Sequence, residues 1–308
     1  MTKKCVNDLA AKIKDDIKLE GIIEFPDFEN NLTYEEIFQN YKNIGFQATD
    51  FYYAIQKIKN MKGKTVLAFT SNIISSGLQN IIKYLVKNKK IDMIITTGGG
   101  IEEDMMKSFN EKFYNCSWNE NGKEMRENGL NRVGNIIIPN EAYVNLEKFI
   151  NKKLEELTMN YTETNPLVLA PSVFLKLISK DLGEGSYLYW AQKNNIPIFP
   201  IGVVDGSIGD IITFSKHRNK LKLDIVEDIR LFYAHKIDSG IVLGDGLVKN
   251  RVLNAVENKG NCVVITTKEK YDSSDPDPSI DEATDEKVTK VIGDVSLLLP
   301  IIVKQCFI

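Results

Sequence analysis

Cysteine, histidine and tryptophan are scarce in this chain, which has four, two and two of them among its 308 residues. The cysteines are Cys5, Cys116, Cys262 and Cys306, which are far apart and form no C-x-x-C pair. This spacing predicts reduced thiols and argues against a zinc site.

Long apolar runs and an excess of positive charge are also missing. No apolar run reaches the length of about 20 residues that a membrane-spanning helix needs. Residues 1–16 carry charges where a signal peptide would have an apolar segment. The net charge of −3 argues against nucleic acid as a partner. With 43% hydrophobic residues the chain can bury a large core, so we expect a cytoplasmic enzyme without membrane or nucleic-acid partners.

Two apolar runs within residues 65–104 each end abruptly in small polar residues. The runs are TVLAFT and IDMIITT, which are short, rich in β-branched residues and almost without charge, as strands covered on both faces must be. Between them, apolar residues recur about every fourth position from Ile73 to Val86, which predicts one helix with an apolar stripe. The unit is therefore strand, helix, strand.

The polar ends of these two strands should lie side by side at the carboxyl edge of a parallel sheet, where such sheets bind ligands. One end is residues 70–72, and the other is the TTGGG stretch of residues 96–100. Three glycines allow a phosphate to approach the backbone closely, and Glu102 and Glu103 could hold a ribose hydroxyl or a cationic substrate. TTGGG lacks the spacing of the dinucleotide-binding G-x-G-x-x-G fingerprint, so a tight strand-to-helix turn is the alternative interpretation.

Three further apolar segments predict strands that end in Gly, Thr or Asp, at residues 195–204, 239–244 and 261–267. Several such strand ends in one chain favour a cofactor cleft. Helices are expected over residues 141–160 and 224–237, and a loop between Pro166 and Pro171.

This alternation predicts an α/β fold, a single doubly wound Rossmann-like domain with a mostly parallel central sheet. We expect this domain to cover residues 61–308. Residues 1–60 should form a helical segment packed on that core.

Seven carboxylates crowd into residues 272–286. A solvated acidic loop is the simple interpretation. The loop directly follows a candidate cofactor strand, however, and carboxylates beside a cleft would attract a polycation such as a polyamine.

Ordered motifs run along nearly the whole chain. They are GFQAT (45–49), TSNIISSG (70–77), TTGGGIEED (96–104), GKEMRENGLNRVGN (122–135), PNE (139–141), YWAQKNNIPIF (189–199), DGSIGD (205–210) and LDIVEDIR (223–230). Through these motifs the chain resembles the deoxyhypusine synthase family.

The resemblance implies NAD as cofactor, with spermidine and the precursor of initiation factor 5A as partners. In that family NAD takes a hydride from spermidine and a lysine captures the aminobutyl group as an imine. The group then passes to one lysine of the precursor, and NADH reduces the product imine. The capturing lysine must be neutral to attack, which requires a desolvated site, and carboxylates hold the cationic ends of spermidine.

The family's binding residues can be placed on this sequence only through the matching motifs. For NAD the resemblance implies Ser71, Asn72, Ser75, Thr97, Gly98, Gly99, Glu103, Asp205, Thr267, Asp272 and Asp294. For spermidine it implies Glu102, Asp210, Asn250, Ser274, Asp275 and Glu282.

Several positions depart from the family's pattern. The family's E-A-V-S-W-G-K is E-A-T-D-E-K-V here, so Val288 stands at the position of the lysine and Glu286 at that of the tryptophan. Asn250 stands where the family has a spermidine-binding histidine. Lys287 is one residue early and could serve as the nucleophile only in a shorter loop. Asp245 interrupts a turn that is all glycine in the family, which predicts altered NAD affinity.

Losing the lysine, the tryptophan and the histidine together predicts a catalytically impaired chain. Enzymes of this family resemble dimers of dimers with active sites between subunits, and some protists pair a lysine-free chain with an active paralogue. The favoured hypothesis is a regulatory subunit in a homo- or hetero-tetramer with a lysine-bearing paralogue. Two alternatives stay open: an autonomous synthase that uses Lys287, and a non-catalytic NAD- or polyamine-binding protein. The sequence also leaves open whether the N-terminal segment gates the cleft.

Overall fold

The computed structural model describes residues 21–268 and 288–308, and the chain divides into two compact units, Met1–Tyr52 and Tyr53–Ile308. The boundary expected after residue 60 stays a prediction. The described part of the first unit contains two short 3-10 helices (Phe28–Asn30 and Tyr41–Asn43), α2 (Tyr34–Asn40) and the start of α3 (Phe46–Lys59).

Helix α2 begins with a capping box. The backbone N–H of Thr33 donates to Glu36 Oε2 at 2.8 Å, and the Glu36 N–H donates to Thr33 Oγ1 at 3.3 Å. Both bonds satisfy amide groups that the helix itself leaves free. Phe38 is buried and packs against the rings of Tyr41 and Phe51, so this unit has a small aromatic core.

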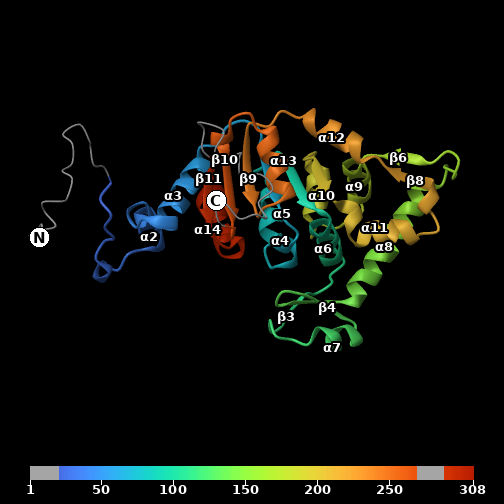
Figure 1. The fold of residues 1–308 in the computed structure, drawn as a ribbon, viewed down its shortest axis with the longest axis horizontal. Coiled ribbons are helices and arrows are strands. Elements are labelled where there is room, and N and C mark those ends of the chain that lie inside the picture. Colours follow the sequence, from blue (N-terminus) through green and yellow to red (C-terminus); the bar gives the residue numbers. More distant parts are fainter. Residues whose placement is uncertain (1–20, 269–287) are drawn as a thin grey trace, which may run out of the picture. The chain divides into compact units, whose positions relative to one another are not determined.

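Six parallel strands form the main sheet of the second unit, in the order β11-β10-β9-β1-β2-β7 (Figure 1). Because neighbouring strands are all parallel, their carboxyl ends lie at one edge. The expected α/β fold with a mostly parallel central sheet is confirmed. The strands are β1 (Thr65–Phe69), β2 (Met93–Thr97), β7 (Ile198–Ile201), β9 (Ser239–Leu243), β10 (Cys262–Thr266) and β11 (Thr289–Ile292).

Helices follow most of these strands. No described helix is long and apolar enough to cross a membrane. The helices of the second unit after α3 are α4 (Asn72–Ser75), α5 (Gln79–Lys87), α6 (Gly98–Ser108), α7 (Gly122–Glu127), α8 (Asn140–Thr158), α9 (Pro171–Ser179), α10 (Tyr187–Asn194), α11 (Ser207–Phe214), α12 (Ile225–Tyr233), α13 (Leu247–Ala255) and α14 (Val295–Phe307).

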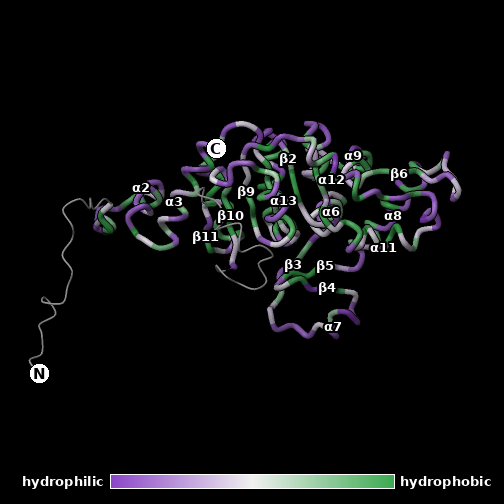
Figure 2. Tube along the Cα trace, turned by 45° about the horizontal axis from the view of Figure 1, so that its top comes forward, coloured by the Kyte–Doolittle hydropathy of each residue, from purple (hydrophilic) through white to green (hydrophobic). Residues whose placement is uncertain are grey.

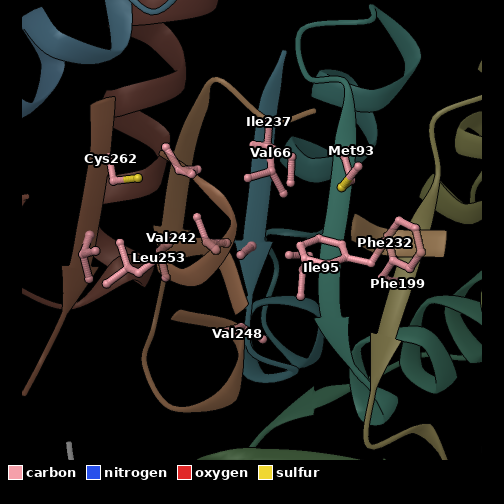
Figure 3. Packing of buried hydrophobic residues seen from close by; sticks show 14 residues of the cluster. Val66, Met93, Ile95, Phe199, Phe232, Ile237, Val242, Val248, Leu253 and Cys262 are labelled. Atoms are coloured by element: carbon pink, nitrogen blue, oxygen red, sulfur yellow. The ribbon is translucent and has the colours of Figure 1, made fainter. Parts of the chain in front are cut away.

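The two faces of the main sheet are both covered. On one face Val66, Val242 and Val264 pack against Phe232 of α12 and Val252 of α13, all less than 3% exposed (Figure 3). Alternate residues of the strands point to the opposite face. There the buried Phe69 ring meets the ring of Tyr187 in α10 edge-on, with centroids 5.8 Å apart. Burial on both faces explains why these strands contain almost no charged residues.

The stretch between β1 and β2 forms two helices, α4 and α5, so the expectation of a single helix is wrong. Ser76 interrupts the helical path because its backbone is extended, with ψ 179°. Its hydroxyl donates to the Ile73 carbonyl at 2.8 Å and accepts from the Leu78 N–H at 3.3 Å. Serine side chains compete with the helix for backbone groups in this way.

Two smaller sheets complete the second unit. Strands β3 (Tyr114–Asn115), β5 (Ile136–Pro139) and β4 (Leu130–Val133) form an antiparallel sheet, and β6 (Leu167–Leu169) pairs in parallel with β8 (Leu221–Leu223). The loop expected between Pro166 and Pro171 is therefore wrong, because β6 lies there. In Figure 2, hydrophobic residues follow the strands of the main sheet, whereas hydrophilic residues gather around α7.

Candidate functional site: the carboxyl edge of the main sheet

The strand order reverses between β1 and β9. From β1 the chain proceeds to β2 and β7 on one side, and then returns to β9, β10 and β11 on the other. Ligands of open α/β sheets bind in the crevice outside such a switch point. The two strand ends approach closely here, since a Cβ on Gly244 would lie 2.9 Å from Thr70 Oγ1.

A cavity of about 580 Å³ opens at this switch point. Four parallel strands contribute their carboxyl ends to it, and the antiparallel sheet contributes a wall. Its lining includes Thr70, Asn72, Ser75, Gly244, Asp245, Gly246, Thr266, Thr267, Asp294, Trp118 and residues 133–136. The sequence-predicted residues Asn72, Ser75, Thr267 and Asp294 are thus brought to one cavity.

The glycine triplet of residues 98–100 forms the first turn of α6. Thr97 precedes this 11-residue helix without capping it, and its hydroxyl instead accepts the Ser71 N–H at 3.1 Å. A Cβ on Gly99 would lie 3.0 Å from the Cβ of Ser71, so glycine permits the close approach of the two strand ends. The amino end of a helix favours an anion such as a phosphate.

Glu103 lies in the second turn of α6 and is 7% exposed. Its Oε2 accepts a hydrogen bond of 2.6 Å from the hydroxyl of Ser75. Burial raises the pKa of this carboxyl to about 7, although the bond from Ser75 and the nearby charge of Lys107 lower it. Glu103 is therefore a hydrogen-bond acceptor that titrates near neutral pH.

Glu102 faces α11 and is 5% exposed. Its Oε1 accepts the Ile208 N–H at 2.9 Å. Burial raises the pKa of Glu102, and the charge of the exposed Asp210 raises it further. Burial also raises the pKa of Tyr143 to about 12, with contributions from Glu103 and Glu102. The two glutamates and Asp210 form an acidic group that suits a cation.

Asp104 completes the acidic run and is fully buried. Its carboxylate accepts from Gln79 Nε2 at 2.6 Å, from the hydroxyl of Ser186, and from the N–H groups of Tyr187 and Leu188 at 3.2 and 3.3 Å. These bonds hold the start of α10 against α6. Asp104 is structural, and it supports the helix that carries the two glutamates.

Asp245 lies in the turn after β9 and lines the cavity. Its Oδ1 lies 3.3 Å from the Nζ of Lys249, and both side chains are almost fully buried. The same oxygen accepts the Gly246 N–H at 2.6 Å. Asn250, one position after Lys249, has a buried Oδ1 that accepts no hydrogen bond within the described residues.

The comparisons with known proteins indicate one family over nearly the full length of the chain. The sequence profile of the family described as deoxyhypusine synthase matches residues 36–306. The chain is 40% identical to a deoxyhypusine synthase of Encephalitozoon cuniculi over 98% of this chain and 95% of that protein. It is 38% identical to a probable deoxyhypusine synthase of Methanocaldococcus jannaschii over 94% and 98%. The chain belongs to the deoxyhypusine synthase family.

A solved structure agrees with this assignment. A crystal structure of a candidate deoxyhypusine synthase from Entamoeba histolytica superposes with a TM-score of 0.67 at 26% identity. The superposition covers 94% of this chain and 96% of that chain. The likeness in fold therefore extends over nearly the full length of both chains.

Not all residues expected at a deoxyhypusine synthase site converge on the 580 Å³ cavity. Asp205 lines a separate cavity of about 210 Å³ beyond β7, together with Asp228 and Arg251. Asp294 also caps α14, because its Oδ1 accepts the Ser296 N–H at 2.7 Å. The predictions for Asp272, Ser274, Asp275, Glu282, Glu286 and Lys287 lie outside the described residues.

Val288, which the resemblance predicts to stand at the position of the family's lysine, lies within the described residues. Its side chain packs partly buried against the hydrophobic cluster around Val264. Lys290, two residues on, pairs with Val264 in the sheet, and its buried Nζ has no hydrogen-bond partner within the described residues.

Sequence reasoning missed two charged features of this site. The ion pair of Asp245 and Lys249 had a local signal, because the two residues are four positions apart. The contacts of Lys107 with the carbonyl groups of residues 74–76 join segments that the sequence does not show to be adjacent.

Proposed function

We propose that this chain is a deoxyhypusine synthase subunit that binds NAD and spermidine and takes part in aminobutyl transfer to a lysine of the initiation factor 5A precursor. Family membership over residues 36–306 supports the reaction class. The observation that carries the proposal is the buried pair Glu102 and Glu103 on the glycine-started helix α6, which follows β2 beside the switch point. Glu103 is hydrogen-bonded to Ser75, which lines the cavity at the switch point. We place this subunit in the cytoplasm.

The residues present suit NAD. The amino end of α6, which begins at Gly98, favours a phosphate, and Glu103 offers an acceptor for a ribose hydroxyl. When bound, NAD would supply a hydride acceptor. Glu102 and Asp210 would attract and orient the cationic polyamine, since their charges lie close enough for Asp210 to raise the pKa of Glu102. Asn72 and Ser75 line the cavity and would also bind the cofactor.

Position 288, where the resemblance places the family's nucleophilic lysine, is a valine in this chain. A valine side chain packed on the core at position 288 cannot capture an aminobutyl group. We therefore propose that the chain acts as a regulatory subunit, in a tetramer with a lysine-bearing paralogue that completes the chemistry.

Reductive trapping tests this proposal. The purified chain is incubated with NAD and labelled spermidine, alone and together with candidate paralogues from the same genome, then treated with borohydride and mapped by peptide mass spectrometry. We expect no label on this chain in either sample and label on the paralogue's lysine in the mixed sample.

Label on Lys287 or Lys290 of the lone chain would contradict the regulatory role and establish an autonomous synthase. An unlabelled mixed sample would contradict the role as an activating subunit. NAD binding without either label would leave a non-catalytic binding protein as the conclusion.

A further inference from the structure

Lys107 follows Glu103 by one helical turn on α6, and its ammonium group contacts α4 rather than a carboxylate. The Nζ donates to the carbonyl oxygens of Ile74, Ser75 and Ser76, at 3.1 Å and 2.8 Å for the last two. An ammonium group has three N–H donors, so all of them are used. The ring of Phe113 lies 4.7 Å from the Nζ and covers it.

The three carbonyl groups are those at the C-terminal end of α4. This helix has only four residues, and a helix so short has little stability of its own. Its last carbonyls carry partial negative charge and lack partners within the helix, so a cation that binds them stabilises the end. Helix α4 carries Asn72 and Ser75, which both line the 580 Å³ cavity.

We propose that Lys107 is a positioning residue for the cofactor: its ammonium group fixes the end of α4, so that Ser75 and Asn72 face the cavity and Ser75 holds Glu103. This inference rests on the proposed NAD site. Lys107 itself is absent from the cavity lining and acts through α4 and Glu103. Its positive charge also favours the ionised form of Glu103.

The expected effect of removing Lys107 has two parts. Lys107→Met should weaken NAD binding by about tenfold, because the α4 contacts are lost. It should also move the midpoint of the pH dependence of NAD binding to higher pH, since one cause that lowers the Glu103 pKa is removed. The other groups facing Glu103 are Ser75, Glu102, Tyr143 and Tyr187, and they are unchanged.

The experiment measures NAD affinity of the full-length chain by calorimetry at pH 6, 7 and 8. Lys107→Arg should keep the wild-type midpoint of the pH dependence, because it keeps the positive charge. It should bind NAD more weakly, because a guanidinium group does not reproduce the three hydrogen bonds to the carbonyl groups of α4. Lys107→Gln keeps hydrogen-bond donors without the charge, and it replaces Lys107→Met in the experiment if the methionine variant does not fold. Lys112→Met is the control, because Lys112 is exposed and nearby.

The outcomes separate this inference from the proposed function. A wild-type chain that does not bind NAD would overturn the proposed function. A wild-type chain that binds NAD, together with folded Lys107 variants of unchanged affinity and unchanged pH midpoint, would overturn the positioning role alone. Equal losses in the Lys107 and Lys112 variants would also overturn it.

Discussion

Replacing Glu103 with glutamine should weaken NAD binding by about 10- to 100-fold, because a hydrogen bond to a charged acceptor contributes about 1.5–3 kcal/mol. The carboxyl group of Glu103 lies buried beside the start of α6, within 2.6 Å of the Ser75 hydroxyl. The amide of glutamine is a weaker acceptor for a ribose hydroxyl. Isothermal calorimetry on the purified chain measures this loss.

The pH dependence gives an independent readout of the same residue. The pKa of Glu103 is raised to about 7, so its carboxyl group is mostly protonated at pH 6 and mostly ionised at pH 8. Since the ionised form is the better acceptor, NAD affinity of the wild-type chain should rise with pH across this window. The Glu103→Gln variant should bind with little change between pH 6 and 8.

A matched control is Glu127→Gln, which alters an exposed glutamate on α7. It should leave both the affinity and its pH dependence as in the wild-type chain. If Glu103→Gln binds NAD as well as the control does, Glu103 does not contact the cofactor.

The Asp104→Asn variant should lose about 3 kcal/mol of unfolding free energy. The carboxylate of Asp104 accepts four hydrogen bonds while fully buried. An asparagine amide has one oxygen, so its NH₂ group would face donors and leave them unsatisfied. Chemical denaturation followed by circular dichroism measures the change.

Asp224→Asn is the control for this variant. Asp224 also accepts two backbone N–H groups, from Val226 and Glu227, but as the N-cap of α12 near the surface. Asparagine caps helices about as well as aspartate, so the unfolding free energy should change little. Similar losses of unfolding free energy in both variants would show that the buried hydrogen bonds of Asp104 stabilise the fold no more than the helix cap at Asp224 does.

The local sequence was sufficient for β1, β2, β7, β9 and β10 of the main sheet, but not for the edge strand β11, because strands covered on both faces are apolar throughout. Runs such as TVLAFT and IDMIITT must then be apolar along their whole length, which makes them easy to recognise. The strand β6 lies between two prolines and has only three residues, and its partner β8 is more than fifty residues away. Short strands that depend on a distant partner have no local signature.

The site could be anticipated only in part, for a similar reason. Small polar residues after strands predicted that residues 70–72 and 96–100 would meet, and the Ser71 to Thr97 bond joins them. The contact of Lys107 with α4 depends on the angle at which α6 packs beside the break at Ser76. A hydrophobic pattern does not encode that angle, so this contact required the structure.

The aminobutyl-transfer assay tests the central claim most directly. Labelled spermidine, NAD and the initiation factor 5A precursor are supplied to this chain alone, to a lysine-bearing paralogue alone, and to the two co-expressed. We predict almost no transfer by this chain alone and far faster transfer by the pair than by the paralogue. Full transfer by the lone chain, or a pair no faster than the paralogue, would contradict the account.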